Sequence, residues 1–333
     1  MKLLMVGNFS HYVYENALCD SLVHYYEVNK FKINDNSVFD KLLTYKKINI
    51  SFCEYVLERK PDVIFFYRTN LIQTATIKKI KRTRPNVKFI LYHNDNPYEG
   101  IFNSIRYHFF LKLIPFMDLV YCYRESNFKQ AIERGAKNVK LFLPHYSSKI
   151  HHKDTGVDMA KMNDVVFIGH YEKDGRDEYI DVLVKNNIDV KIFGSDVWVK
   201  IAKKKGWPTN IISKNVYNDD YRKTIAFAKI GLCFLSKKHK DCYTRRCFEI
   251  PAIGTLLLSE YTEELDNLFK ENVGAVFFRT PNDLLNKVIE LLANDSQREE
   301  ISISGYNCVV AECSEKNRAE MIKNDIERLY EER

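Results

Sequence analysis

The residues of this chain that are best suited to chemistry lie in a basic loop and the predicted helix that follows it, residues 237–254. Lysines crowd the loop, and Arg245 and Arg246 stand at the first turn of the helix. A helix N-terminus already carries about +0.5 of a unit charge, so cations there cost stability unless an anion is bound. Free N–H groups, the helix dipole and two guanidinium groups together make a phosphate site. The segment therefore predicts a site for a diphosphate.

Glu249 lies one helical turn beyond Arg246, among apolar residues that predict its burial. A buried carboxylate needs partners. One possibility is an intrahelical salt bridge, with Arg245 at i,i+4 or with Arg246 at i,i+3. The other is a pair of hydroxyls from a ribose. The helix alone leaves both open, and the basic loop before it favours the ligand.

Other polar loops directly follow predicted strands, which is where ligands bind in open α/β sheets. One of them contains Gly169, His170 and Arg176, and a glycine there lets the backbone approach a ligand closely. A solvated loop is the alternative for His170. The stretch after the predicted strand at residues 165–168 is thus a second part of the candidate site.

In the first half of the chain, His93 and Asp95 follow a predicted strand. The sequence Asn-Asp-Asn-Pro at residues 94–97 predicts an Asx turn, and His93 could equally be a core histidine. We expect the turn to form and favour a functional role for His93. Gly7, Asn8 and His11 occupy the equivalent edge after the first strand, and we expect them to border an acceptor.

Strand-like and helix-like runs alternate along both halves of the chain, which is typical of parallel α/β sheets. Residues 144–163 are polar and lack periodicity, so they predict a linker. We therefore expect a domain at residues 1–150 and another at 160–312. Two halves of similar size predict two Rossmann-like domains that face each other across a cleft.

The stretch Thr-Arg-Arg-Cys-Phe-Glu-Ile-Pro-Ala-Ile-Gly-Thr-Leu-Leu-Leu-Ser-Glu, residues 244–260, resembles the CgeB-like, spore-maturation-type glycosyltransferases. These are similar to family 4 of the retaining glycosyltransferases, which have the GT-B fold. The resemblance extends over about residues 160–320. In the wider group the motif E-x7-E precedes and enters this helix, and Glu249 matches its second position. Asp241 stands at the first position in place of glutamate, and Arg246 matches the R-x-x-E element.

The resemblance implies roles for these residues. Glu249 would hold the donor ribose, and Arg176 and Arg246 the donor phosphates. His93 would contact the transferred sugar and Asp95 the acceptor. The charged helix at about residues 315–333 would cross back to the first domain, as it does in this fold. Retention at the anomeric carbon is implied by the family and not by any nucleophilic carboxylate that the sequence reveals.

Composition sets limits on the partners. The chain has 333 residues and a net charge of +7, which permits a phosphorylated small molecule, an anionic membrane surface or nucleic acid. The eight cysteines have no metal-ligand or disulfide-scaffold spacing, so we expect reduced thiols, a cytoplasmic location, no metal and no other cofactor. No apolar run reaches the ~20 residues of a membrane span.

Membrane contact at the inner face is a further possibility. Residues 78–84 form a basic run that could steer the chain to an anionic surface carrying a lipid-linked acceptor. Aromatic and aliphatic residues at 109–116 either pack in the core, which we favour, or dip into a membrane. 

The expected partners are thus a nucleoside-diphosphate sugar and a glycan, lipid-linked or protein acceptor. Three rival interpretations remain. A nucleotide-sugar epimerase would have the same fold. A nucleic-acid-binding protein would suit the charge, but no recognition motif supports it. A non-catalytic sugar-nucleotide binder would explain Asp241 in place of glutamate.

Overall fold

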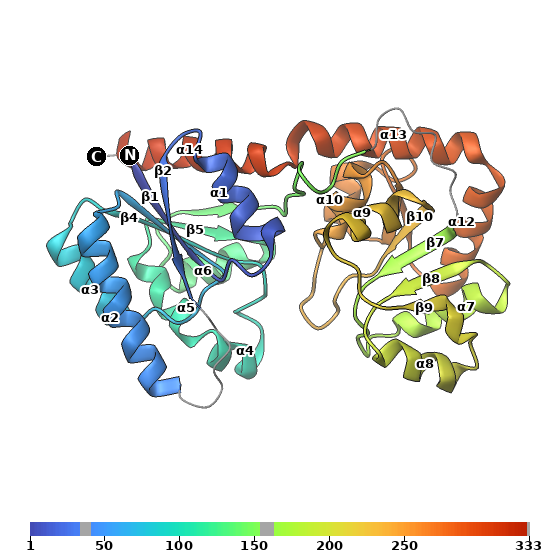
Figure 1. The fold of residues 1–333 in the computed structure, drawn as a ribbon, viewed down its shortest axis with the longest axis horizontal. Coiled ribbons are helices and arrows are strands. Elements are labelled where there is room, and N and C mark those ends of the chain that lie inside the picture. Colours follow the sequence, from blue (N-terminus) through green and yellow to red (C-terminus); the bar gives the residue numbers. More distant parts are fainter. Residues whose placement is uncertain (34–40, 154–162, 332–333) are drawn as a thin grey trace. The chain divides into compact units, whose positions relative to one another are not determined.

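The computed structural model describes residues 1–33, 41–153 and 163–331, without the side chains of residues 41–44. The chain forms two compact units. The first contains residues 1–143 together with 315–333, and the second contains residues 144–314. Each unit holds one six-stranded sheet whose strand pairs are all parallel (Figure 1). The two predicted Rossmann-like units are therefore confirmed, and the cleft between them stays a prediction.

The first sheet has the strand order β2-β1-β3-β4-β5-β6. Its strands are β1 (Lys2–Gly7), β2 (Glu27–Lys32), β3 (Val63–Tyr67), β4 (Lys88–His93), β5 (Leu119–Cys122) and β6 (Val139–Leu141). The central strands are almost continuously apolar, because helices cover both faces of a parallel sheet. All five residues of β3 are buried.

Successive residues of each strand point to opposite faces, and each face has its own helices. Leu4 and Val6 of β1 join a core with residues of α2, α3 and α5. On the other side, α14 lies beside α1 (Figure 1). The helices of this unit are α1 (Ala17–Leu22), α2 (Lys41–Arg59), α3 (Thr74–Thr83), α4 (Gly100–Arg106), α5 (His108–Leu113), α6 (Phe128–Glu133) and α14 (Glu315–Glu331).

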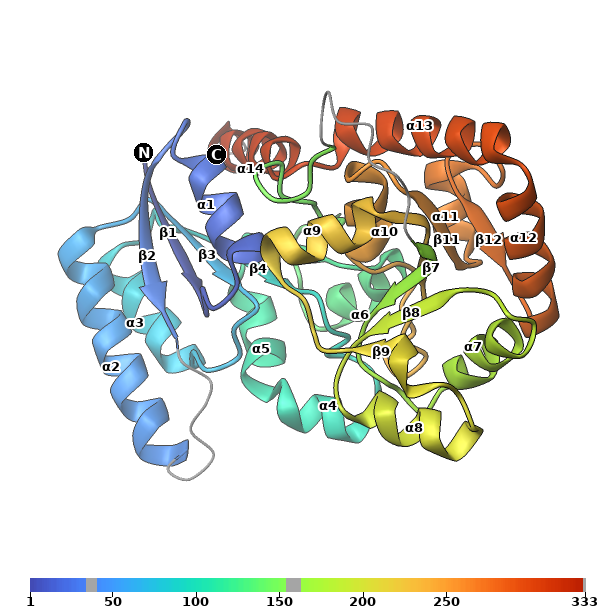
Figure 2. The same cartoon turned by 45° about the vertical axis from the view of Figure 1, so that its right-hand side comes forward.

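The second sheet has the order β12-β11-β10-β7-β8-β9. Its strands are β7 (Asn163–Ile168), β8 (Val190–Phe193), β9 (Ile212–Ser213), β10 (Ala228–Cys233), β11 (Leu256–Glu260) and β12 (Val276–Phe278). Its helices are α7 (Arg176–Lys185), α8 (Val197–Lys205), α9 (Asn218–Ala226), α10 (Arg246–Ala252), α11 (Glu263–Phe269), α12 (Pro281–Ala293) and α13 (Asp295–Glu312). In the turned view α7 lies beside α12 (Figure 2).

Helix α14 is part of the first unit although it ends the described chain. Asp325 accepts hydrogen bonds from the Tyr121 hydroxyl and from Lys140 Nζ, both at 2.7 Å. The Tyr330 hydroxyl donates to the carbonyl of Asp62 at 2.9 Å. A buried carboxylate with two partners fixes the helix against β5 and β6, as the resemblance implied.

The structure differs from the sequence prediction in two places. Residues 144–150, assigned above to the first domain, belong to the second unit, because the chain from Tyr146 pairs with Ser314 there. The predicted linker falls partly on residues 154–162, which lie outside the described residues. The suggestion that residues 109–116 dip into a membrane is wrong for Phe110, Leu111, Leu113 and Ile114, which are buried in the first core. Among the described residues no helix is both long and apolar enough to cross a membrane.

Candidate functional site

Glu249, on α10, lies at the centre of a buried polar cluster in the second unit. It is 7% exposed. The Tyr221 hydroxyl of α9 donates to its Oε2 at 2.9 Å, and Arg245 Nε donates to its Oε1 at 3.1 Å. His151 Nε2 lies 3.9 Å from the same Oε1. A carboxylate has about four acceptor sites, so the two hydrogen bonds leave capacity for ligand hydroxyls.

Cationic side chains and hydrogen-bond donors around Glu249 keep it ionised, and near pH 7 the cations are Arg245 and Arg246. Burial alone would raise the pKa of this carboxyl, but His151, Arg245, Arg246 and the Tyr221 hydroxyl together hold it below its usual value. Burial lowers the pKa of His151 to about 4, so the ring is neutral near pH 7. Its Nδ1 accepts the backbone N–H of Ser147 at 3.1 Å, which places the ring hydrogen on Nε2, facing Glu249.

Both sequence interpretations of Glu249 bear on this cluster. The intrahelical salt bridge at i,i+4 is present, and Arg245 is the partner. The expectation of free N–H groups at the start of α10 is wrong for its first turn. The N–H of Cys247 bonds to the Thr244 carbonyl at 3.1 Å, and those of Phe248 and Glu249 bond to the Arg245 carbonyl at 2.9 Å. The carbonyls of Thr244 and Arg245, in the turn before the helix, accept these bonds. Of the groups predicted to bind a diphosphate, the side chains of Arg245 and Arg246 are therefore the ones that remain.

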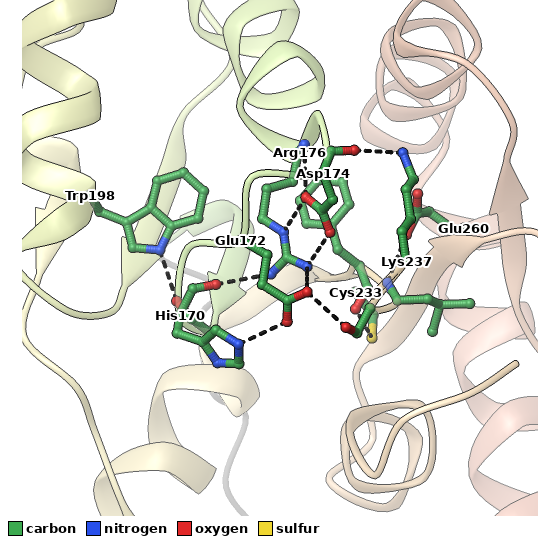
Figure 3. Close-up of polar contacts among 12 residues, drawn as sticks. His170, Glu172, Asp174, Arg176, Trp198, Cys233, Lys237 and Glu260 are labelled. Atoms are coloured by element: carbon green, nitrogen blue, oxygen red, sulfur yellow. Dashed lines mark hydrogen bonds and ion pairs between the residues drawn. The ribbon is translucent and has the colours of Figure 1, made fainter. Parts of the chain in front are cut away.

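The loop after β7 forms a second polar cluster around Arg176 (Figure 3). Arg176 Nε and Nη2 donate to the two carboxylate oxygens of Asp174 at 2.9 and 2.6 Å. Its Nη1 donates to the carbonyl of His170 at 2.9 Å, and its Nη2 lies 3.6 Å from Glu172. The side chain is almost fully buried.

These contacts give Arg176 a structural partner that the sequence did not reveal. Its guanidinium makes a two-pronged pair with Asp174 and closes the loop on itself, an arrangement in which both charges are desolvated together. Arg176 therefore positions the loop, and its contact with donor phosphates stays a prediction. His170, by contrast, has an exposed side chain, with its Nε2 2.8 Å from Glu172 Oε1.

Gly169 is required by packing. A Cβ at Gly169 would lie 2.7 Å from the Phe167 ring, and one at Gly194 would lie 2.5 Å from Trp198. Trp198 is fully buried and donates from Nε1 to the Gly169 carbonyl at 2.8 Å. Trp198 thus belongs to the core, and its indole nitrogen points to the backbone beside His170 (Figure 3). The two glycines let the backbones after β7 and β8 approach each other closely.

The loops after β10 and β11 are joined to the same cluster. Ser236 Oγ donates to Glu172 at 2.7 Å, and Lys237 Nζ donates to the Asp174 carbonyl at 2.7 Å. Glu260 accepts the N–H of Leu235 at 2.6 Å, and burial raises the pKa of this carboxyl. Asp241 is half-buried in the loop before α10, where its N–H bonds to the Ser236 carbonyl at 3.0 Å. Three loops at the carboxyl edge of the sheet thus form one network.

In the first unit, His93 ends β4 and is buried. Its Nδ1 accepts the N–H of Asp95 at 3.1 Å, and its ring packs edge-on against Tyr107 and Phe110. Burial is the main cause that lowers its pKa to about 4. Asp95 accepts the Tyr107 hydroxyl at 2.5 Å. His93 and Asp95 are therefore linked by a hydrogen bond within the turn that follows β4.

The Asx turn that the sequence predicted is also present. Asn96 Oδ1 accepts the N–H of Tyr98 at 3.2 Å. The roles proposed for His93 and Asp95 toward the sugar and the acceptor stay predictions.

Gly7, Asn8 and His11 lie at the neighbouring edge, after β1. A Cβ at Gly7 would lie 2.9 Å from Glu15, which is 1% exposed, so the glycine makes room for that carboxylate. The N–H of Asn8 approaches Glu15 Oε1 at 3.4 Å. His11 is exposed, with its ring 6.3 Å from that of Tyr14.

Sequence reasoning missed several members of these clusters. The sequence analysis gave His151 no role in the site, and Tyr221 carried no signal because it is 28 residues from its partner Glu249. Glu172 and Asp174 could have been found from the alternation of acids and bases in the loop after β7. No group of three or more metal-ligating side chains occurs in the described part of the chain. Independence from metal nevertheless stays a prediction.

Comparison with known proteins agrees with this geometry. Residues 176–324 match the family model described as glycosyl transferase-like. Sucrose-phosphate synthase from Thermosynechococcus elongatus superimposes with a TM-score of 0.76 at 10% identity, covering 100% of both chains. The HepE protein of Anabaena, solved in complex with UDP-glucose, gives 0.72 at 13% identity, covering 98% of this chain and 100% of that one.

A putative UDP-N-acetylglucosamine 2-epimerase from Listeria monocytogenes has a lower TM-score of 0.64 at 9% identity, covering 100% of this chain and 97% of that chain. No curated protein matches the sequence.

The chain thus has the GT-B fold, with two Rossmann-like units. The match to the glycosyl transferase-like family covers most of the second unit, including Glu249, and the first part of α14.

Proposed function

We propose that this chain is an enzyme that transfers a sugar from a nucleoside-diphosphate sugar to a glycan, lipid-linked or protein acceptor of the cell envelope. The observation that carries the proposal is the Glu249 cluster. A buried carboxylate that is held ionised by two arginines and a tyrosine hydroxyl is suited to accept the hydroxyls of a ribose. It lies in the segment that matches the glycosyl transferase-like family.

The chemistry follows from the charges. The bond between the anomeric carbon and the donor phosphate oxygen breaks, and the departing nucleoside diphosphate gains negative charge. Arg245 bonds to Glu249 and Arg246 follows it at the start of α10, and fixed cations that stabilise developing charge commonly supply the largest catalytic effect. The acceptor hydroxyl forms the new bond to the anomeric carbon, and its proton passes to the departing diphosphate. Retention, metal independence and the CgeB-like specificity rest on the sequence resemblance.

Uridine is the first base to test, because the HepE structure contains UDP-glucose. The assay incubates the full chain with UDP-glucose or UDP-N-acetylglucosamine without acceptor and follows the products by NMR. A glycosyltransferase is expected to release UDP slowly by transfer to water, with the sugar configuration at C2 unchanged. Formation of the C2 epimer would instead support an epimerase, the class to which the Listeria structure is assigned.

Membrane contact would suit a lipid-linked acceptor on the cytoplasmic face. The supporting observation is α4, on which Ile101, Phe102 and Ile105 are 78%, 89% and 69% exposed. The cationic helix α3 belongs to the same unit, and Lys78, Lys79 and Arg82 are exposed on it. Apolar side chains combined with cations suit an anionic bilayer surface.

A further inference from the structure

Three polar residues stand side by side at the carboxyl edge of the first sheet. Val6 is in register with Phe66, and Tyr67 with Tyr92. Continuing this register toward the carboxyl ends of the strands places Asn8, Arg68 and His93 side by side. The N–H of Arg68 still bonds to the Tyr92 carbonyl at 2.9 Å. In open α/β sheets this edge is where ligands bind.

Arg68 has a conformation that the fold does not explain. Its φ is 55°, in the left-handed region that arginine adopts rarely. Its guanidinium carbon lies 4.1 Å from the centre of the Tyr14 ring, and its Nε is buried without a partner. Within the described residues its guanidinium makes no hydrogen bond. Strained residues with unused donors occur preferentially at functional sites.

The carboxylates nearest to Arg68 are used elsewhere. Asp95 accepts the Tyr107 hydroxyl at 2.5 Å, and Glu15 receives the N–H of Asn8 at 3.4 Å. Among the described residues, neither carboxylate has an oxygen within 4.0 Å of an Arg68 nitrogen, so neither forms an ion pair with it. Burial would lower the pKa of Arg68, but Tyr14, Tyr67 and these carboxylates hold it above its usual value, so the charge persists.

His93 adds a neutral donor beside this cation. Because its Nδ1 accepts the N–H of Asp95, the ring hydrogen is on Nε2, which has no hydrogen-bond partner among the described residues. Arg124 is 2% exposed and donates to the Asn94 carbonyl at 3.2 Å, which fixes the turn after His93. A guanidinium and an N–H donor thus come from neighbouring backbone positions at the sheet edge, and the charge of Arg68 contributes to lowering the pKa of His93.

We propose that Arg68 and His93 form a subsite for an oxyanion, a phosphate or carboxylate, carried by the acceptor. The proposal rests on the proposed glycosyl transfer and names the class of acceptor: an anionic sugar or sugar-containing lipid. Arg68 binds the oxyanion through its unused N–H groups, as guanidinium groups commonly do. Nε2–H of His93 donates to a second oxygen of the same ligand.

Calorimetric titration of the full chain with three soluble sugars tests this subsite. The probes are glucose 6-phosphate, glucuronate and uncharged glucose, so the phosphate and carboxylate forms are separated. The variant is Arg68→Asn, because asparagine tolerates the left-handed backbone and should fold. Arg82→Asn removes the same charge from an exposed position on α3. Arg245→Gln identifies any binding at the donor site.

We expect at least one charged sugar to bind the wild type about tenfold or more tightly than glucose, since a charged hydrogen bond contributes roughly 1.5–3 kcal/mol. Arg68→Asn should abolish that preference, while Arg82→Asn and Arg245→Gln keep it. Equal binding of glucose and the charged sugars, or a preference that survives in Arg68→Asn, would overturn the subsite. Titration of Arg68→Asn with UDP tests the donor site separately, and wild-type affinity there leaves the proposed transfer intact.

Discussion

At the scale of single residues, the two buried histidines predict a pH-dependent stability. His93 and His151 both have their pKa lowered by burial from 6.5 to about 4. Between pH 6.5 and pH 4, these two histidines are therefore protonated in the unfolded chain but neutral in the folded chain. The part of the free energy of unfolding that depends on these neutral histidines is fully present above pH 6.5. It falls as the pH is lowered toward 4, by up to about 3 kcal/mol for each histidine.

Urea unfolding from pH 7.5 to pH 4.5 measures this loss. His93→Gln and His151→Gln should each remove part of the slope, whereas the exposed His11 offers a control, His11→Gln, that should leave it unchanged. A slope that both buried-site variants retain would contradict the assigned cause.

Arg176 yields a second prediction at this scale. Removing one partner of a buried ion pair leaves an uncompensated charge, so Arg176→Met should destabilise the second unit by about 3–5 kcal/mol. Because Asp174 is the partner, the double variant Arg176→Met/Asp174→Asn should recover part of that loss. Strictly additive effects in thermal unfolding would show that Arg176 acts outside this pair.

At the scale of elements, α4 predicts binding to anionic vesicles. Replacing Phe102 and Ile105 by serine should weaken binding to phosphatidylglycerol vesicles by about a hundredfold or more, measured by co-sedimentation, because each buried apolar side chain contributes roughly 1.5–3 kcal/mol. The same two residues are exposed in the folded chain, so the thermal stability should not change. Binding at the wild-type level would rule out α4 as the membrane contact.

Strands and helices whose apolar residues follow a regular pattern could be predicted from the sequence, and those without such a pattern could not. Most strands of both sheets were predicted because their residues are continuously apolar. Strand β2 was missed, since residues 27–32 are polar and half-exposed at the sheet edge. Helix α13 was missed because its apolar residues follow no clear stripe.

The site shows the same division. Glu249, Arg245 and His93 could be singled out as candidates from their place after strands and within helices. Arg68 was not, because its significance depends on register with Tyr92 and on a left-handed backbone, which no local pattern reports. The role of Arg176 could not be read either, since its pairing with Asp174 is a matter of loop geometry.

At the scale of the whole molecule, the chain is built so that its last helix stabilises its first unit. Deleting residues 315–333 would remove Asp325 from Tyr121 and Lys140 and expose the face of the sheet that α14 covers. We expect calorimetry to show loss or strong lowering of one thermal transition. The transition of the second unit should persist. Loss of both transitions together would show that the units fold as one.

The central claim is that the second unit binds a nucleoside diphosphate at Glu249, and a thermal-shift panel tests it most directly. UDP, ADP, GDP and CDP are compared, each in EDTA, on the wild type, Glu249→Gln and the exposed control Glu299→Gln. A ligand at 100 times its dissociation constant stabilises by about 2.7 kcal/mol, a shift that is easily measured. The account predicts that one diphosphate raises the melting temperature of the wild type and Glu299→Gln but not of Glu249→Gln. No shift with any diphosphate, or an equal shift in Glu249→Gln, would contradict it.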